Sequence, residues 1–358
     1  MRRHYLDNIR WMAVVLVLVY HVAYLFNHVG ILGGVAPLPG GEWVDVFGML
    51  PYPWFMALLF LVAGMSTRYA LEKRSCRQFL AERARKLLVP STLGLFVLHW
   101  VTGYWNVRLG GGAEYIPGFL RYPVYALSGI GPLWFVQMLF LFSLLGLLVK
   151  QVDRDEKCYR LCGKCRLPVL VLLVVPVWGA AQVGNLPVFT MYRFGIYGMC
   201  YLLGYLVFSH DEVIERLEKA KLPLLGAGLV LGAVFGFRYY GEDYTAPGCL
   251  QGLLANLYLW AMVLAILGCA KAWLDFTTPV FTYCAGASFG WYVLHYPVVL
   301  CVACLLAEWG KLPTAAVYLA VLVLELGITA GLYEAVKRMP VVRFAVLGRK
   351  GQRGSSKK

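Results

Sequence analysis

The 358-residue sequence lacks several features of a soluble or secreted protein. It shows no internal repeat at a fixed period, and its only compositionally biased segment is the C-terminal GRKGQRGSSKK. Acidic residues are scarce, with 19 Asp and Glu against 33 Lys and Arg. No small-x-small cleavage site follows the first apolar run, so we expect an uncleaved first span and not a signal peptide. Apolar residues dominate instead, at 60% of the chain, and the mean hydropathy is +0.66.

Ten apolar runs are long enough to cross a membrane, for which roughly 20 helical residues suffice. They predict an all-α, polytopic integral membrane protein with about ten transmembrane helices. The predicted spans are 9–28, 48–69, 87–106, 132–149, 167–184, 191–208, 223–240, 249–270, 285–306 and 313–336.

The basic residues are distributed unevenly between the loops of this arrangement. With a cytoplasmic N-terminus, 28 of the 33 Lys and Arg fall on the cytoplasmic side and 5 outside. The segments 68–86 and 150–166 carry seven and six of them, and the tail from Lys337 carries eight. The positive-inside rule therefore predicts a multi-pass cell-membrane protein with both termini in the cytoplasm. The basic residues that orient the protein in the membrane explain its net charge of +14. We therefore expect membrane lipids as partners and no nucleic acid.

The first span carries ionisable residues, which are costly inside a bilayer and mark functional sites. Arg10 and His21 are eleven residues apart, about three helical turns, so they share a helix face with Asp7 and lie about 16 Å apart along the axis. This geometry suits a ligand with an anionic head at the surface and a buried reactive end, such as a thioester of coenzyme A. Asp7 either caps the first helical turn, where it can also pair with Arg10, or is itself one of the catalytic residues.

Five stretches resemble motifs of the membrane-bound acyltransferase-3 family. YLDNIRWMAVVLVLVYH resembles the opening Leu-Asp-x-[Ile/Leu]-Arg and His signature. FLVAGMST resembles a Phe-Phe-Val-x-Ser-Gly segment, and FLAERARKLLVP resembles an Arg-x-x-Arg cluster before Pro. PLWFVQMLF resembles a Leu-Trp-Phe segment, and SFGWYVLHYPVV resembles a Ser-Tyr-x-x-Tyr-x-x-His-x-Pro segment. Ala63, Lys86 and Phe289 replace the usual Ser, Arg and Tyr. The resemblance covers roughly residues 5–335 and is greatest to the glucan-biosynthesis branch of the family.

The resemblance implies an O-acyltransferase that moves an acetyl or succinyl group from cytoplasmic acyl-CoA to a hydroxyl of a cell-envelope carbohydrate or glycolipid. It makes His21 the general base or acyl relay, and Arg10 its partner in the basic–His motif. It also makes Arg83 and Lys86 ligands for the CoA phosphates. Lysine cannot bind phosphate in the bidentate manner of arginine, so Arg85 is an alternative ligand. We divide the chain into a membrane acyltransferase domain, 1–340, and a basic cytoplasmic tail, 341–358.

Four further polar residues have two interpretations each. His295 lines the CoA path or braces its helix through a backbone carbonyl. Glu325, near mid-membrane, is a protonated or ion-paired acid, or a catalytic residue that orients His21. Trp134 and Gln137 belong to the interfacial aromatic belt, or form a platform that binds the sugar substrate.

The cluster KCYRLCGKC also leaves two interpretations open. Cys158, Cys162 and Cys165 are ordinary reduced thiols of a cytoplasmic loop, or zinc ligands that need a fourth partner such as Cys76. The acyltransferase chemistry itself calls for no metal. The oligomeric state cannot be read from the sequence.

A function of another class is a proton-coupled secondary transporter, with buried His21 and Glu325 as a proton relay. The sequence shows no repeated halves with paired broken helices, so we favour the enzyme. For the enzyme we expect the donor to enter from the cytoplasm and the acceptor from outside, under loops that carry Trp43, Trp105 and Tyr115. The alternative is that both substrates enter from inside.

Overall fold

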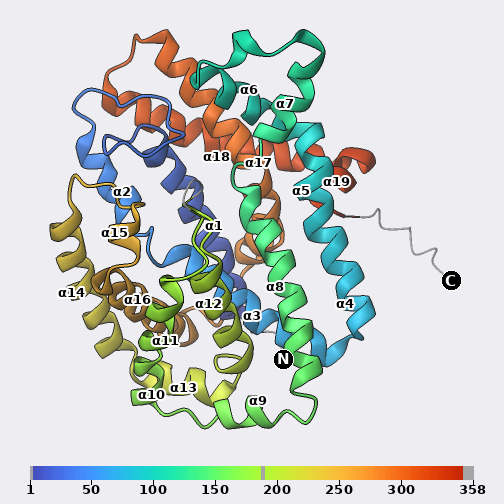
Figure 1. Ribbon diagram of the computed structural model, residues 1–358, viewed down its shortest axis with the longest axis vertical. Helices are drawn as coiled ribbons and strands as arrows, with labels where there is room; N and C mark the ends of the chain where they lie inside the picture. Colours follow the sequence, from blue (N-terminus) through green and yellow to red (C-terminus); the bar gives the residue numbers. More distant parts are fainter. Residues whose placement is uncertain (1–2, 187–189, 350–358) are drawn as a thin grey trace. The chain divides into compact units, whose positions relative to one another are not determined.

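The computed structural model describes residues 3–186 and 190–349, and helices are the regular elements of these two stretches (Figure 1). Among the described residues, eight helical segments are long and apolar enough to cross a membrane. They are His4–Leu25, Phe55–Lys73, Cys76–Leu109, Leu133–Val152, Lys221–Tyr239, Leu253–Trp273, Pro279–Trp309 and Thr314–Arg338. Each coincides with one predicted span, and the two remaining predicted spans contain shorter apolar helices, Leu167–Ala181 and Phe194–Leu206. The chain is an all-helical membrane protein, while the number of ten spans and the orientation of the termini stay predictions.

The chain divides into two compact units. The first comprises Met1–Phe79 and Leu141–Gly286, and the second comprises Leu80–Phe140 and Ala287–Lys358. The helices of the first unit are α1 (His4–Leu25), α2 (Asp45–Met49), α3 (Phe55–Lys73), most of α8 (Leu133–Val152), α9 (Lys157–Cys162), α10 (Leu167–Leu172), α11 (Val174–Ala181), α12 (Phe194–Leu206), α13 (Asp211–Lys219), α14 (Lys221–Tyr239), α15 (Pro247–Leu250) and α16 (Leu253–Trp273).

Helices α3 and α12 of the first unit cross with their backbones in contact. A Cβ atom at Gly64 would lie 2.0 Å from the Tyr201 carbonyl oxygen, and one at Gly204 would lie 2.0 Å from the Leu61 carbonyl oxygen. Small residues allow membrane helices this close an approach. The Tyr201 hydroxyl also donates a hydrogen bond of 2.8 Å to Thr67. This crossing fixes the position of α3, which faces α1.

The first turn of α1 is tied to the segment that follows α16. The buried Asn8 amide donates to the carbonyl oxygens of Leu274 and Phe276, at 2.7 and 2.9 Å. The Tyr5 backbone N–H donates to the Asp275 carboxylate at 3.2 Å. These hydrogen bonds hold the part of α1 that carries Asp7 and Arg10.

The second unit contains a long helical run interrupted twice by a wider turn. The run consists of α4 (Cys76–Arg83), the π-helical turn η2 (Ala84–Leu88), α5 (Val89–Gly94), the π-helical turn η3 (Leu95–His99) and α6 (Trp100–Leu109). Its other helices are α7 (Arg121–Ser128), α17 (Pro279–Trp309), α18 (Thr314–Arg338) and α19 (Pro340–Leu347). The boundaries between the units fall within α4, α8 and α17.

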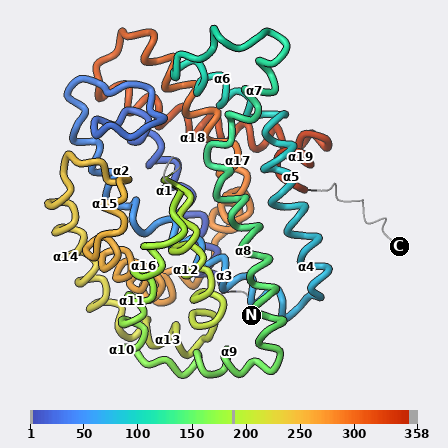
Figure 2. Tube along the Cα trace, viewed as in Figure 1, coloured from blue at the N-terminus to red at the C-terminus, as the bar shows by residue number. Residues whose placement is uncertain are grey.

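The short helix α19 packs on α5, as the trace in Figure 2 shows. Val346 and Leu347 are fully or almost fully buried there. Gly348 ends the helix with φ +60°, and a Cβ atom at this position would lie 2.2 Å from the Arg85 carbonyl oxygen. Part of the predicted cytoplasmic tail, 341–349, is therefore folded onto the second unit, and 350–358 lie outside the described residues. The division of the chain at residue 340 stays a prediction.

Candidate functional site

Three of the predicted site residues lie on α1, which is unbroken from His4 to Leu25. The Arg10 guanidinium forms an ion pair of 2.7 Å with the Asp7 carboxylate, one turn earlier. Because the side chains of Arg10 and Asp7 are 35% and 23% exposed, the pair contributes only about 0.2–1 kcal/mol to stability. Its main effect is to orient a cation that remains accessible to a ligand.

Ser66 on α3 holds the other side of the same guanidinium. The Arg10 Nη2 atom donates to the Ser66 hydroxyl, which in turn donates to the Val62 carbonyl oxygen at 2.5 Å. Sequence reasoning assigned no role to Ser66, although it belongs to the FLVAGMST segment. The available signal was a pair of hydroxyl residues, Ser66 and Thr67, at the end of the apolar part of α3.

His21 is bonded to its own helix through one ring nitrogen. Its Nδ1 atom lies 2.8 Å from the Val17 carbonyl oxygen. Since a carbonyl oxygen only accepts hydrogen bonds, Nδ1 carries the proton, and Nε2 is the basic nitrogen of the neutral ring. This tautomer is the one that a general base acting through Nε2 requires.

Two aromatic rings of α1 flank the His21 imidazole. Tyr20 and Tyr24 lie edge-on to it, with ring centroids 5.1 and 5.9 Å from that of His21. Tyr20 also packs against Tyr52, and Tyr52 against Tyr244, at 5.8 and 5.2 Å. Tyr20 and Tyr24 are neighbours of His21 on α1, whereas Tyr52 and Tyr244 come from distant segments, so sequence reasoning had not found the whole cluster.

The predicted phosphate ligands lie in the second unit, at the start of its long helical run. Arg83 is the last residue of α4, whereas Arg85 and Lys86 lie in the π-helical turn η2. A π-helical turn holds more residues than an α-helical turn, so residues three apart are rotated further from each other. Arg83 and Lys86, three residues apart, therefore point in more different directions here than they would on an α-helix. Lys86 Nζ lies 3.9 Å from the Glu82 carboxylate.

The C-terminal segment approaches the same basic cluster. Gly348 packs against the Arg85 backbone, and Arg349 follows it directly in the chain. The Arg349 guanidinium donates to the Tyr333 hydroxyl of α18 at 3.2 Å. The structure thus adds Arg349 to the cationic groups near η2, a residue that sequence reasoning had treated only as an orientation signal.

Three other predicted residues of the second unit have defined contacts. His295 on α17 is fully buried, and its Nδ1 atom lies 2.7 Å from the Tyr292 carbonyl oxygen. This contact favours the bracing interpretation for His295. On α8, Trp134 is half-buried, and the Gln137 amide donates a long hydrogen bond of 3.5 Å to the Ser91 carbonyl oxygen. Their binding of a sugar stays a prediction.

Glu325 on α18 is fully buried, and Thr329, one turn later, is almost fully buried. Neither carboxylate oxygen of Glu325 has a hydrogen-bond partner among the residues that the structure describes. An ionised carboxylate is expensive at such a position in a membrane helix. Glu325 belongs to the second unit and His21 to the first, so the orientation of His21 by Glu325 stays a prediction.

The cysteine cluster lies on and just after α9. Cys158, Cys162 and Cys165 are free thiols. Burial, with a smaller contribution from the Cys158 thiol, raises the pKa of Cys162 to about 12. Within residues 3–186 and 190–349, no group of three or more His, Cys, Asp or Glu side chains is arranged to hold a metal ion. The zinc interpretation thus has no ligand set in this part of the chain.

The aromatic residues expected to face the acceptor differ in exposure. Trp43 in the first unit and Tyr115 in the second are 54% and 86% exposed. Trp105 is only 6% exposed, because it packs inside the second unit, and it offers little surface to an acceptor.

Comparison with known proteins gives matches over nearly the whole chain. The sequence profile of a family described as an acyltransferase domain, the acyltransferase-3 family, matches residues 3–334. Glucans biosynthesis protein C from the Escherichia coli strains E24377A, SMS-3-5 and HS is 20% identical over 376 residues. The alignments cover 97% of this chain and 95% of each relative. No solved structure was found to match the chain.

Proposed function

The chain belongs to the acyltransferase-3 family, and from this membership we propose that it moves an acetyl or succinyl group from cytoplasmic acyl-CoA to a hydroxyl of a cell-envelope carbohydrate or glycolipid. The observation that carries the proposal is the arrangement on α1. Arg10 is held from two sides by Asp7 and Ser66, and His21 presents a basic Nε2 on the same unbroken helix. A carbohydrate acceptor is further supported by the name of the relatives, which refers to glucans.

His21 acts in this proposal as the general base. Its Nε2 atom takes the proton of the acceptor hydroxyl while the hydroxyl oxygen attacks the thioester carbonyl carbon. The new C–O bond forms, the C–S bond breaks, and the CoA thiolate leaves with the proton from the imidazolium. The products are the acylated acceptor, free CoA and the neutral imidazole. In the alternative role of acyl relay, Nε2 itself carries the acyl group between the two steps.

The donor is held by cationic groups. Arg10 lies about 16 Å from His21 along α1, which suits an anionic part of acyl-CoA at one end and the thioester at the other. Arg83, Arg85 and Lys86 bind the CoA phosphates through charge-assisted hydrogen bonds. Arg349, brought near Arg85 by the packing of Gly348, adds a fourth cation. No metal takes part.

The enzyme works across the cell membrane, with both termini in the cytoplasm. The distribution of Lys and Arg supports this orientation, because the basic segments fall on one side. The donor enters from the cytoplasm and the acceptor from the outside. Exposed rings such as Trp43 and Tyr115 are suited to bind sugar faces.

The test uses the purified protein in sealed vesicles of known orientation. Radiolabelled acetyl-CoA or succinyl-CoA is supplied to one face, and envelope carbohydrates or glycolipids to the other. We expect acyl transfer only when acyl-CoA is on the cytoplasmic face. If neither donor is consumed with any envelope extract, the acyltransferase proposal fails. If acceptor supplied only on the cytoplasmic face is modified, the two-sided arrangement fails while the role of His21 stands.

A further inference from the structure

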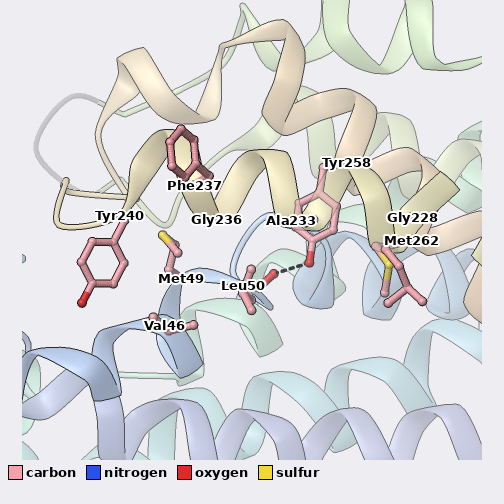
Figure 3. Close-up of a pocket in the computed structure, with 12 residues that line it drawn as sticks. Val46, Met49, Leu50, Gly228, Ala233, Gly236, Phe237, Tyr240, Tyr258 and Met262 are labelled. Carbon is pink, nitrogen blue, oxygen red and sulfur yellow. Dashed lines mark hydrogen bonds between the residues drawn. The ribbon is translucent and has the colours of Figure 1, made fainter. Parts of the chain in front are cut away.

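The interior of the first unit is mostly apolar. The cavity of about 600 Å³ between α2, α14 and α16 has this character, with Met49, Phe237 and Met262 among its lining residues (Figure 3). None of the described side chains along its wall is charged. A charged side chain that is buried in such a unit needs a specific reason, because burial of a charge without a partner is costly.

Three charged residues of the first unit are buried among the residues that the structure describes: Asp45, Arg68 and Arg193. The first two have ionisable partners. The Asp45 carboxylate lies 3.3 Å from His28 Nδ1, and the Arg68 guanidinium lies 2.7 Å from the Glu156 carboxylate. Arg193 is only 3% exposed, and no carboxylate of the described chain lies within ion-pair distance of it.

The Arg193 guanidinium is held by neutral groups. Its Nη2 atom donates to the Leu250 carbonyl oxygen at 2.9 Å, and its central carbon lies 5.9 Å from the centre of the Tyr197 ring. The same carbonyl oxygen accepts a hydrogen bond of 3.0 Å from the Asn256 amide, so it does not need a charged donor. A guanidinium has five N–H donors and stays protonated in proteins. The positive charge of Arg193 is therefore not compensated within the described part of the chain.

Arg193 lies beside the aromatic rings that lead to His21. Its charge acts electrostatically on the Tyr52 hydroxyl. Tyr52 packs against Tyr20, and Tyr20 lies edge-on to His21, with ring centroids 5.8 and 5.1 Å apart. In the predicted orientation, Arg193 and Tyr52 stand near the outer ends of their spans, and His21 lies about one turn before the outer end of α1. The buried cation is thus near the basic nitrogen, on the side from which we expect the acceptor.

We propose that Arg193 determines substrate specificity by binding a carboxylate or phosphate group of a substrate held at His21. The inference rests on the proposed acyl transfer, and it adds that one substrate carries an anionic group close to the new ester bond. This group is either the distal carboxylate of a dicarboxylic acyl group such as succinyl, or an acidic group of the acceptor. A guanidinium binds either oxyanion through two parallel N–H donors, which supplies the missing negative charge.

Substrates that differ only in charge test the proposal. Arg193→Gln keeps an N–H donor for Leu250 but loses the charge, and it is assayed with succinyl-CoA and with acetyl-CoA. Each donor is offered with a neutral glucan oligosaccharide and with its phosphorylated and carboxylated forms. We expect the KM of one anionic substrate to rise roughly tenfold or more, while kcat/KM for its neutral counterpart stays unchanged.

The pattern of the loss separates the two sources of the anion. A loss with succinyl-CoA alone identifies the acyl carboxylate, and a loss with the acidic acceptors alone identifies the acceptor. An equal loss with every pair would mean that Arg193 has only a structural role, and no loss with any pair would mean that it binds no substrate; either result overturns the proposal. Arg238→Gln removes an exposed arginine that is paired with Glu242, so it is the matched control and should affect no pair.

A binding measurement distinguishes failure of this inference from failure of the proposed function. If the wild-type protein transfers no acyl group, acyl transfer fails, and unfolding temperatures in detergent then test the anion site alone. Succinate or inorganic phosphate should raise the unfolding temperature of the wild-type protein and of Arg238→Gln more than that of Arg193→Gln. Equal stabilisation of all three by both anions would overturn the inference.

A second variant covers the case in which Arg193→Gln does not fold. Arg193→Lys keeps the charge but cannot bind an oxyanion through two parallel N–H donors. We expect it to raise the KM of the anionic substrate several-fold and to leave the neutral substrate unaffected. A fall in activity that is equal for neutral and anionic substrates would overturn the proposal here as well.

Discussion

The Arg10 guanidinium is held between two helices, by the Asp7 carboxylate at 2.7 Å on α1 and by the Ser66 hydroxyl on α3. The glycine crossing of α3 with α12 fixes the second of these contacts. A cation with so few rotational choices is prepared to bind an anion without further loss of side-chain entropy.

Loss of either contact should impair catalysis more than folding. We expect Ser66→Ala and Asp7→Asn each to reduce acyl transfer by roughly 10- to 100-fold, because small displacements of positioning groups are costly. The change in stability should stay below about 1 kcal/mol for Asp7→Asn, since the ion pair is partly exposed. Steady-state kinetics and thermal unfolding in detergent measure the two effects. Full activity of Arg10→Lys, which keeps the charge but loses the two-sided geometry, would argue against positioning.

His21→Ala should strongly reduce acyl transfer while the protein still inserts and folds. The general base supplies roughly 10²–10⁴ in rate, so we expect a loss of that size. His21→Gln is the sharper variant, because the glutamine amide can donate a hydrogen bond but cannot accept a proton. Near-normal turnover of the folded glutamine variant would remove His21 from the mechanism.

Alanine at Arg83, Arg85 or Lys86 should raise the KM for acyl-CoA with little change in kcat. Each lost charge-assisted hydrogen bond is worth about 1.5–3 kcal/mol, so an increase of about tenfold or more is expected for a residue that binds phosphate. Arg349→Ala should have a similar effect if its segment contributes. The reverse pattern, weaker acceptor binding with unchanged acyl-CoA binding, would assign these residues to the other substrate.

Gly348→Ala should weaken the packing of α19 on the second unit. The residue has φ +60°, and the added Cβ would lie 2.2 Å from the Arg85 carbonyl oxygen. Strain of this kind costs about 1–3 kcal/mol. We expect faster proteolysis after residue 338 and a raised KM for acyl-CoA. Gly331→Ala, where the structure leaves open space, is the control and should change neither.

Gly64→Ala should destabilise the crossing of α3 and α12. The methyl group would lie 2.0 Å from the Tyr201 carbonyl oxygen, and overpacking of this kind costs about 1–3 kcal/mol. A lower unfolding temperature in detergent is therefore expected. Gly226→Ala on α14 meets no atom within 4 Å and serves as the control. An equal effect of both substitutions would mean that the crossing is not tight in solution.

The helices could be predicted because membrane spans need long apolar runs, and these are visible in any single sequence. Such runs do not show where a helix is shortened, and the segments at 167–184 and 191–208 form helices of fewer residues than predicted. The packing of 340–347 as α19 was also missed, because its basic neighbours suggested a tail.

Local spacing predicted the arrangement on α1 correctly, since Asp7, Arg10 and His21 lie on one continuous helix. Contacts between segments far apart in the chain could not be predicted from local spacing. Ser66 is 56 residues from Arg10, and the rings of Tyr52 and Tyr244 join the His21 cluster from separate parts of the chain. No local pattern encodes these pairings, because they depend on how the helices pack.

The two π-helical turns, η2 and η3, change how the long run from Cys76 to Leu109 must be probed. A helical wheel assumes about 100° per residue throughout. Each π-helical turn takes up an additional residue, so a wheel drawn from one end misplaces everything beyond Leu88 and again beyond His99. A cysteine-accessibility scan of this run would therefore show three short stripes out of register with one another, instead of one continuous stripe. Deletion of a single residue within Ala84–Leu88 would remove the additional residue, so the wheel would hold as far as η3 while the later side chains keep their neighbours.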